Sequence, residues 1–295
     1  CLQFIEQYKE LVARPMILNY IDFLVDKAPQ YQYSYQVYAQ IISRWLEREH
    51  NIRGKGPGFS ENLYNFSRFF ALDLYHHTEH LSIADLTALQ KLSDQCQVGL
   101  DLFDMQAHSL LTRGAHNNYK FSHKSILEYF LALELFENPA FAKTFKGFEG
   151  MDMLRKFYQE MVLDKIAKPF FCEKFGLENG KQYSAEEVMR IKGCLGCGSM
   201  FLPIGSYEKA FFFNFSLDKL KDVTQIDLSN TDLQDFRIVA CMPKLQQLNV
   251  ANNPALCSFD YLFVEGLNRD LKEIQVQGTN IQAATLENGV AFVYG

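Results

Sequence analysis

The sequence has no apolar run long enough to cross a membrane, and this absence is the first limit on what the chain can be. A membrane-spanning helix needs about 20 consecutive apolar residues, and no segment approaches that length. The N-terminus also lacks the charged and apolar regions of a secretory signal. We therefore expect no membrane span and a cytoplasmic location.

A cysteine pattern that would predict disulfide bonds is lacking as well. Seven cysteines, an odd number, are scattered along 295 residues, which indicates reduced thiols rather than a disulfide framework. Cys194 and Cys197 form a CxxC pair, but a structural zinc site needs four ligands, and only Cys172 offers a third, so whether the pair binds metal is left open. Three histidines at helical spacing are interpreted as the polar side of a helix: His76, His77 and His80. We predict no metal site.

Excess basic charge and a phosphate-binding loop are also missing. A net charge of −6 argues against electrostatic binding to nucleic acid. A P-loop requires Gly-x-x-x-x-Gly-Lys followed by Ser or Thr, whereas the Gly-Lys pairs at Gly54 and Gly180 are followed by Gly56 and Gln182. An acidic Walker-B strand is absent too. We therefore expect that this chain is not an enzyme and does not hydrolyse ATP.

Apolar residues, in contrast, are abundant. The composition is 48% apolar with 26 Phe and 15 Tyr, which supplies a large core, and the length suggests about two domains. Helical patterns run to about residue 112. Pro15 suits the first turn of a helix running to about Lys27. The next helix has one apolar face: Tyr35, Tyr38, Ile42 and Trp45.

A break separates these helices from the next group. The segment from Arg53 to Gly58 is rich in Gly and Pro and predicts a flexible surface loop whose Lys and Arg are solvated. Ser60 can cap a following helix, and Ser82 with Asp85 forms a capping box for another. The apolar residues of these two helices are Leu63, Phe66, Phe69 and Phe70, then Leu86 and Leu89.

The segment from Tyr119 to Phe136 predicts a helix with a polar start and an apolar body. It follows a predicted hairpin formed by residues 110–113 and 119–121. Ser122 is a natural N-cap, which makes His123 the first helical residue, and the later residues are apolar on almost every face. The open first turn, with His123, Lys124 and the hydroxyls of Ser122 and Ser125, is suited to hold an anion. A capped surface histidine is the alternative interpretation.

The middle of the chain is less legible. Residues 137–206 are interpreted as a helical connector. It contains an amphipathic helix from Met151 to Ala167 and a capping box from Ser184 to Glu187.

The last third carries an internal repeat. Three segments, beginning at Val223, Leu245 and Leu271 at intervals of 22 and 26 residues, fit the leucine-rich-repeat template of about 20 to 29 residues. Each unit supplies one short strand that stacks on its neighbour. The positions that fit are Val223, Ile226, Leu228, Thr231 and Leu233, then Leu245, Leu248, Val250, Asn253 and Ala255, then Leu271, Ile274, Val276, Thr279 and Ile281.

The strands of such a repeat line a concave surface, which is a usual binding surface. The side chains expected there are polar and rich in amides: Gln225, Asp227, Ser229, Gln247, Asn249, Ala251, Glu273, Gln275 and Gln277. We predict a protein partner on this face. A stack that only solubilises and caps the chain is the alternative.

One segment resembles a known family. The residues from Phe121 to Ala132, with Phe-Ser-His-x-Ser followed by Glu-Tyr-Phe and Ala, resemble the signature that ends the winged-helix domain of NACHT-type STAND signalling ATPases, which include NOD-like receptors and bacterial anti-phage proteins. The segments from Ala13 to Leu18 and from Tyr38 to Glu49 are similar to the helical domain of the same family. About the first 136 residues are covered.

The resemblance of the first 136 residues and the repeat pattern of the last third together imply a fold, and the resemblance also implies a mode of nucleotide binding. The fold is a mainly α-helical bundle with a winged helix, followed by a short α/β leucine-rich-repeat solenoid. The implied divisions are a NACHT helical domain at 1–52, a winged-helix domain at 59–136, the connector at 137–206 and the repeats at 207–295. His123 inherits contact with the β-phosphate of ADP, and Pro15 lies against the adenine. ADP or ATP, with Mg²⁺, is held through a nucleotide-binding domain that we expect upstream of Cys1.

The resulting hypothesis is the regulatory and ligand-sensing half of a NACHT-type ATPase switch. Such a protein holds ADP in its inactive state, recognises a trigger through its repeats and oligomerises on activation, in innate immune or anti-phage defence. Its partners are the protein trigger, its own nucleotide-binding domain and further copies of itself. The alternative is a leucine-rich-repeat interaction module with no nucleotide dependence.

Overall fold

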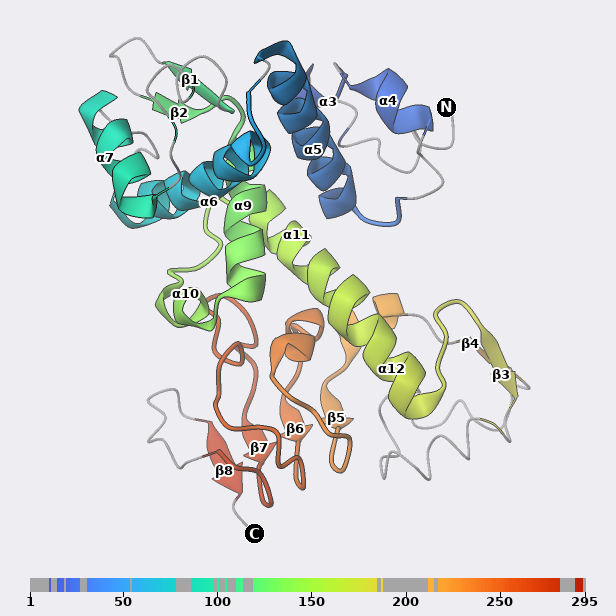
Figure 1. Ribbon diagram of the computed structural model, residues 1–295. Coiled ribbons are helices and arrows are strands. Elements are labelled where there is room, and N and C mark those ends of the chain that lie inside the picture. Colours follow the sequence, from blue (N-terminus) through green and yellow to red (C-terminus); the bar gives the residue numbers. More distant parts are fainter. Residues whose placement is uncertain are drawn as a thin grey trace. The chain divides into compact units, whose positions relative to one another are not determined.

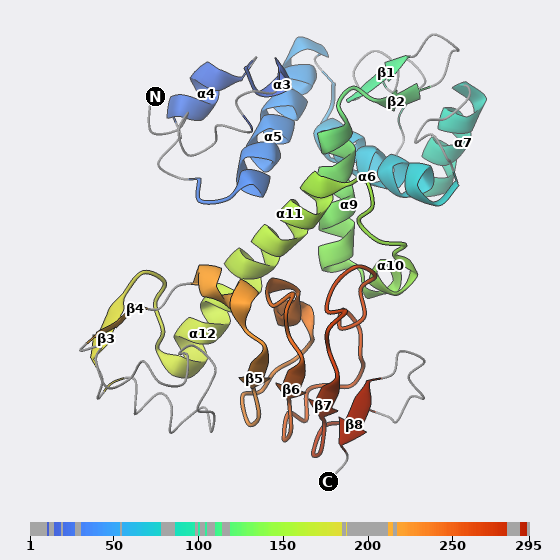
Figure 2. The same ribbon diagram turned by 180° about the vertical axis from the view of Figure 1, so that it is seen from behind.

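The structure is a computed structural model. It describes the following residues of the 295: 11, 15–18, 20–26, 31–53, 55–77, 86–97, 100, 104, 110–113, 119–184, 187, 212–214, 217–281 and 290–293. In these ranges the longer elements are helices and the strands are short; none of their sheets is closed (Figures 1 and 2). The mainly helical fold that was predicted is confirmed at this level.

The chain divides into two compact units. The first contains Cys1–Glu134 and Gly150–Glu160, and the second contains Leu135–Glu149 and Met161–Gly295. The predicted boundaries at 52, 136 and 206 stay predictions.

Within its described residues, the regular structure of the first unit is helical apart from one hairpin. Its elements are α3 (Pro15–Leu18), α4 (Ile21–Asp26), α5 (Ser34–Arg53), α6 (Phe59–His77), α7 (Leu86–Cys96), β1 (Leu111–Arg113), β2 (Tyr119–Phe121), most of α9 (Lys124–Glu137) and most of α11 (Asp152–Val162). Strands β1 and β2 pair antiparallel, with Leu111 opposite Phe121. The predicted hairpin before α9 is therefore confirmed.

Aromatic side chains form the core of this unit around α9. Phe121 and Phe130 lie 5.9 Å apart between ring centroids, and Phe70 on α6 lies 5.2 Å from Phe121. Tyr129 of α9 lies 6.0 Å from Phe157 of α11 and 6.5 Å from Tyr38 of α5 between ring centroids. Because α5, α6 and α11 all pack against this helix, its apolar body is buried from Ile126 to Phe136.

Three predictions for this unit need correction. The helix expected from Pro15 to Lys27 is two helices, because a tight turn in which the Tyr20 N–H donates to the Ile17 carbonyl at 3.0 Å comes between them. Helix α6 begins at Phe59, so Ser60 is not its cap; the Ser60 hydroxyl donates to the Leu46 carbonyl instead. Phe69, expected on the apolar face, is 39% exposed.

Lys55 also differs from its prediction as a solvated charge. Its Nζ lies 2.8 Å from Oδ1 of the buried Asp104 and 5.6 Å from the ring centre of Phe59. A buried carboxylate needs a nearby cation to offset its lost hydration, and Lys55 provides it. The capping box at Ser82 and Asp85 lies outside the described residues, as does the turn from Gly114 to Asn118.

The second unit combines short helices with small sheets. Its elements are α10 (Pro139–Thr144), the π-helix η2 (Leu163–Ala167), α12 (Lys168–Phe175), β3 (Gln182–Ser184), β4 (Phe212–Asn214), the 3-10 helices η3 (Leu217–Asp222) and η4 (Arg237–Cys241), and β5 (Gln225–Asp227), β6 (Gln247–Asn249), β7 (Glu273–Gln275) and β8 (Ala291–Val293). Strands β3 and β4 pair antiparallel.

The helix predicted from Met151 to Ala167 continues further than expected. Helix α11 passes into the π-turn η2 and then into α12, which ends at Gly176 with φ of 65°. The capping box at Ser184 is present: the Ser184 N–H donates to the Glu187 carboxylate at 2.7 Å, and the Glu187 N–H donates to the Ser184 hydroxyl at 3.2 Å.

A strand lies at each of the three predicted repeat positions. Strands β5, β6, β7 and β8 form one parallel sheet in that order (Figure 1). Ile226 pairs with Leu248, and Leu248 pairs with Ile274, so the buried residues of successive repeats are aligned. Ala255 is exposed while the adjacent Leu256 is buried, which corrects the predicted register at that position. Strand β8 was not predicted.

The turns after these strands repeat as closely as the strands do. Asn230, Asn252 and Gly278 occupy equivalent positions and all have left-handed backbones, with φ of 57°, 56° and 70°. Glycine suits the third position because a Cβ on Gly278 would lie 2.5 Å from Oδ1 of Asn252 and 3.2 Å from its Cα. The repeat is therefore encoded in its turns as well as in its apolar residues.

Candidate functional site

His123 is exposed at the start of α9, directly after the hairpin. The chain is held on both sides of it. The Ser122 N–H donates to the Leu110 carbonyl at 2.9 Å, and the His123 carbonyl accepts from the Ile126 N–H at 3.0 Å. The backbone that carries the imidazole is thus fixed, while the ring is open to solvent.

Helix α9 begins one residue later than predicted. Its first residue is Lys124, not His123, so Ser122 stands one position too far from the helix to be its N-cap. Helix ends are commonly assigned to within one or two residues. His123 itself is the residue that flanks the helix, and the free N–H groups of the first turn still lie beside it.

The two hydroxyls expected near His123 have different environments. Ser122 is exposed, but Ser125 is 4% exposed and its Oγ accepts a hydrogen bond from the Tyr38 hydroxyl at 2.8 Å. Position 125 lies on the side of α9 that packs against α5, and this is why the prediction for Ser125 is wrong. One hydroxyl remains on the open side.

Lys124 places a cation at the same end of α9. Its Nζ donates to the Gly150 carbonyl and lies 4.0 Å from the buried Glu128 carboxylate. The side chain is still 56% exposed. The start of α9 therefore combines an exposed imidazole, an exposed ammonium and free backbone N–H groups, which is the chemistry that binds phosphate or carboxylate.

Pro15 is the first residue of α3, as its predicted first-turn position requires. Its side chain lies outside the described part of the structure. The prediction that Pro15 and His123 share one nucleotide cleft therefore stays a prediction.

The predicted partner-binding residues form two rows across the parallel sheet. Gln225, Gln247 and Glu273 align in one row. The second row, two residues further along each strand, holds Asp227, Asn249 and Gln275. All six are exposed or half-buried. The sheet thus brings together side chains from segments up to about fifty residues apart in the sequence, as stacked repeats do.

Two of these side chains also stabilise the turns that follow their strands. An Asp227 carboxylate oxygen accepts from the Ser229 N–H at 2.9 Å, and the side-chain amide oxygen of Asn249 accepts from the Ala251 N–H at 3.0 Å. Such Asx-turns are local backbone interactions. The first row and Gln277, which is exposed after β7, are therefore the better candidates for contacts with a partner.

An exposed ion pair joins two residues that each precede a strand of this sheet. Lys244 Nζ lies 2.7 Å from the Asp222 carboxylate, and hydrogen bonding to Lys244 lowers the pKa of Asp222. Both groups are well solvated, so the pair contributes little to stability.

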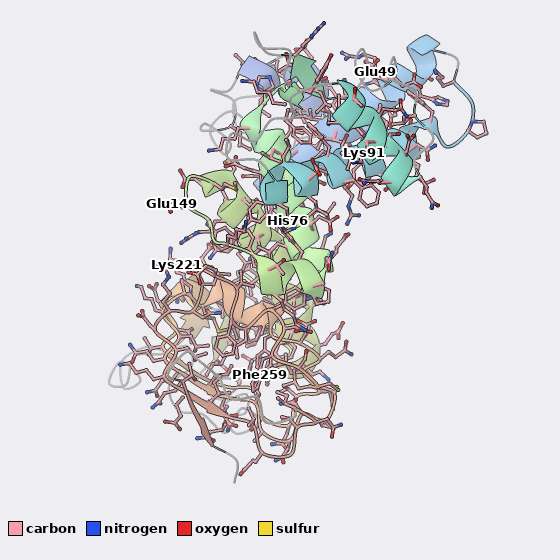
Figure 3. The ribbon with its side chains drawn as sticks, turned by 90° about the vertical axis from the view of Figure 1, so that its left-hand side faces the viewer. Glu49, His76, Lys91, Glu149, Lys221 and Phe259 are labelled. Atoms are coloured by element: carbon pink, nitrogen blue, oxygen red, sulfur yellow. The ribbon has the colours of Figure 1, made fainter. Side chains whose placement is uncertain are left out.

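The candidate metal ligands are not brought together in the part of the chain that is described. No group of three or more His, Cys, Asp or Glu side chains in those ranges is arranged to hold a metal ion. Cys172 is exposed on α12, and His76 is exposed on α6 (Figure 3). Cys194, Cys197 and His80 lie outside the described residues. Burial raises the pKa of the Cys241 thiol, which leaves it unreactive.

Sequence reasoning missed one residue that organises the repeats. Asn253 is fully buried, and its amide nitrogen donates to the carbonyls of Leu228 and Val250 at 2.8 Å. Its oxygen accepts from the N–H groups of Thr231 and Leu233 at 3.1 and 2.8 Å. Its place in the repeat template was visible in the sequence. Its bonds to the preceding repeat could not be predicted, because they depend on how the repeats stack.

The chain was also compared with protein-family models, curated proteins and solved structures, and none of them matches it. Among the helices that the structure describes, none has both the length and the apolar character needed to span a bilayer.

Proposed function

We propose that this chain is the regulatory and ligand-sensing half of a NACHT-type STAND ATPase switch. In this proposal, residues 59–136 act as a winged helix that presents His123 to the β-phosphate of ADP. Residues 207–295 act as a leucine-rich-repeat solenoid that receives a protein trigger. Catalytic loops and Mg²⁺ belong to a nucleotide-binding domain outside these residues, so this chain does not hydrolyse ATP by itself.

The observation that carries the proposal is the position of His123. The family signature requires a histidine that is accessible at the start of a buried helix, and His123 is exposed while α9 is buried from Ser125 onward. The antiparallel hairpin immediately before it supports the winged-helix interpretation. A histidine sealed in the core would have ruled this role out.

The aligned sheet supports the sensing role. Its first row, Gln225, Gln247 and Glu273, offers amide and carboxylate groups at regular spacing on one face. A trigger that prefers the open state of the switch shifts the population toward it, whereas ADP favours the closed state. On release the protein oligomerises. Innate immune or anti-phage defence is the biological setting we propose for it.

Retention of nucleotide tests this proposal. The full-length protein that contains this chain is purified from its own cells without added nucleotide. Adenine nucleotides are then extracted and identified by mass spectrometry. We expect ADP in the wild type, its loss in His123→Ala and its retention in the control His76→Ala, since His76 is an exposed histidine on a different helix. Absence of nucleotide from the wild type would refute the proposal, and so would equal retention in the two variants.

The alternative function is a leucine-rich-repeat interaction module that does not depend on nucleotide. The regular rows on the sheet favour it as strongly as they favour a sensor. The two functions differ in what His123 does: the module predicts that His123→Ala changes neither bound nucleotide nor oligomeric state.

A further inference from the structure

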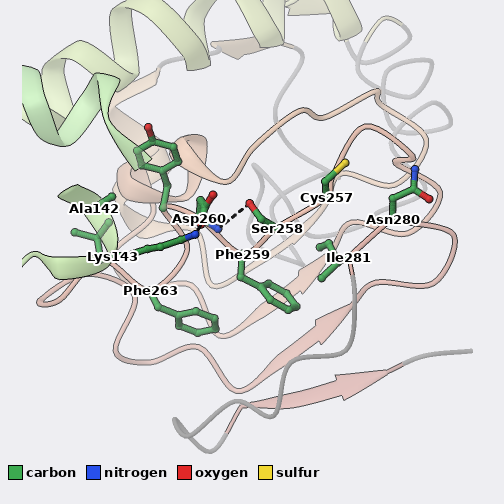
Figure 4. A pocket seen from close by; sticks show the side chains of 11 residues that line it. Ala142, Lys143, Cys257, Ser258, Phe259, Asp260, Phe263, Asn280 and Ile281 are labelled. Atoms are coloured by element: carbon green, nitrogen blue, oxygen red, sulfur yellow. Dashed lines mark hydrogen bonds and ion pairs between the residues drawn. The ribbon is translucent and has the colours of Figure 1, made fainter. Parts of the chain in front are cut away.

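A hollow of about 550 Å³ lies in the second unit, away from the rows of the parallel sheet. Helix α10 contributes Ala142 and Lys143 to its lining, and most of the remainder comes from the segment between β6 and β7 (Figure 4). Its volume is in the range of small-molecule sites, about 300 to 1,000 Å³.

One side of the hollow is aromatic. Phe259 and Phe263 are both half-buried, and their ring centroids lie 6.1 Å apart. Phe236, which is fully buried, stacks on Phe259 at 5.9 Å and an interplanar angle of 26°. Phe236 thus covers one face of the Phe259 ring, while the Phe259 side chain as a whole remains half-buried. Ile281 completes the apolar wall.

The other side is polar but carries no net charge. Lys143 Nζ lies 2.8 Å from Oδ1 of Asp260, whose side chain is 21% exposed. The Ser258 hydroxyl oxygen accepts from the Asp260 N–H at 3.4 Å. The ammonium has further donors and the carboxylate further acceptor sites, so this end can both donate to and accept from a ligand.

The segment that forms the hollow is where the repeat departs from its own pattern. The interval from Leu245 to Leu271 is 26 residues, against 22 for the one before it, and insertions in repeat proteins map to loops on one face that often bind ligands. Tyr261 within this segment has φ of 68°, which is rare for a bulky residue. It is buried, and the Arg237 guanidinium lies 5.3 Å from its ring centre.

We propose that this hollow binds a small, flat, uncharged aromatic molecule that carries an amide or hydroxyl group. The ring lies against Phe259 and Phe263, and the polar group meets the Lys143–Asp260 pair. A charged ligand is disfavoured because it would leave one member of that pair without compensation. The site is separate from the strand face and does not depend on the nucleotide switch.

Thiol protection tests the site directly, because Cys257 lines the hollow and is exposed. Benzamide is the probe, and the rate of iodoacetamide alkylation of each cysteine is followed by peptide mass spectrometry. Benzamide at a concentration that occupies about two-thirds of the sites is expected to slow the reaction of Cys257 by about threefold, and higher concentrations are expected to slow it further. Cys172, exposed but outside the lining, serves as the internal control and keeps its rate.

Two matched compounds and one variant define the chemistry. Benzoate has the same ring with a charge, and cyclohexanecarboxamide has the same amide without a flat ring; both are expected to protect Cys257 less than benzamide does. The variant Phe259→Leu/Phe263→Leu is expected to lose protection, whereas Phe69→Leu, an exposed Phe on α6, keeps it. If the double variant does not fold, the three compounds on the wild type decide. The proposal fails if benzamide protects neither thiol or both equally, if benzoate or cyclohexanecarboxamide protects as well, or if a folded double variant stays protected.

Discussion

The two units satisfy their buried polar groups in different ways. In the first unit some buried groups have partners that are distant in sequence: Arg68 pairs with Glu134, and Tyr38 bonds to Ser125. In the second unit Asn253 bonds to the preceding repeat, and bonds within a repeat recur from one repeat to the next. Thr231 and Thr279 occupy the same repeat position, and each hydroxyl donates to the carbonyl three residues earlier, at 2.6 and 2.7 Å.

This difference explains why the units are unequally legible from sequence. A repeat specifies its own neighbours, because stacking fixes which residues meet once the period is known. In a helical unit, the spacing of the apolar residues shows which side of a helix is buried but not which other helix packs against it. From this difference we predict that a substitution which removes a bond between repeats destabilises the second unit. A substitution which breaks one long-range pair should destabilise the first unit.

The largest effect is expected for Asn253→Ala. The substitution removes the partner of three buried backbone groups, the N–H groups of Thr231 and Leu233 and the carbonyl of Val250, while the Leu228 carbonyl keeps its bond from the Thr231 hydroxyl. Each buried unsatisfied group costs about 1–3 kcal/mol, and since such costs are not additive we expect a loss of about 4 kcal/mol in the free energy of unfolding. Hydrogen exchange of peptides from β5 to β7 measures it.

The control for this variant is Gln247→Ala, which removes an exposed amide from β6 and should change exchange little. Trp45, the single tryptophan, is buried in α5, so its fluorescence during urea unfolding reports on the first unit. Its transition should be unchanged in Asn253→Ala. If the Trp45 transition shows a loss in the free energy of unfolding as large as the loss measured by exchange in the repeats, this difference between the units would be contradicted.

The next largest effect is expected for Arg68→Met. It leaves the Glu134 carboxylate, 7% exposed, without the guanidinium that donates to it at 2.6 Å. Breaking a buried pair in this way costs about 3 kcal/mol, and the Trp45 transition should move to lower urea concentration. Arg44→Met, which breaks an exposed pair with Glu47, should cost less than about 1 kcal/mol. Recovery of stability in Arg68→Met/Glu134→Leu would identify the uncompensated charge as the cause; equal loss in Arg68→Met and Arg44→Met would contradict this account.

A smaller effect separates two glycines with similar backbones. Both glycines have a left-handed backbone, with φ of 70° at Gly278 and 65° at Gly176. The new Cβ in Gly278→Ala would also lie against the Asn252 side chain, whereas the Cβ in Gly176→Ala would have open space around it. We expect about 1 kcal/mol for Gly176→Ala and about 1–2 kcal/mol more for Gly278→Ala because neighbouring atoms must shift. The same unfolding and exchange measurements compare them, and equal losses would show that the close turn contact is unimportant.

The smallest effect concerns pH. Burial raises the pKa of Glu160 above its ordinary value of 4.5, although hydrogen bonds from Tyr35 and Ser34 and the charge of Lys156 oppose the change. Because the folded state then holds this proton more tightly than the unfolded state, Glu160 contributes a decrease in stability as pH rises from 4.5.

Glu160→Gln should remove that contribution, so the midpoint of the Trp45 transition should depend less on pH above 4.5 than in the wild type. Glu61→Gln, on the exposed side of α6, is the control and should keep the wild-type slope. An unchanged slope in Glu160→Gln would show that this carboxylate does not titrate differently in the folded state.

The sequence predicted the repeat strands, the hairpin before α9 and the exposure of His123, because each follows from local spacing or from a helix start. It did not predict the Lys55–Asp104 pair, the burial of Ser125 or strand β8. The first two depend on which helices meet, and a strand that departs from the repeat template gives no periodic signal. The hollow near Lys143 and Asp260 was also missed, since its residues come together only when α10 packs on the repeats.

Oligomeric state tests the central claim most directly. The protein purified from its own cells, in excess ADP and without trigger, is examined by mass photometry as wild type, His123→Ala and the control His76→Ala. The account predicts monomers for the wild type and the control and a shift to oligomers for His123→Ala, because the closed state loses its contact with the diphosphate. A His123→Ala protein that stays monomeric, like the wild type, would contradict it.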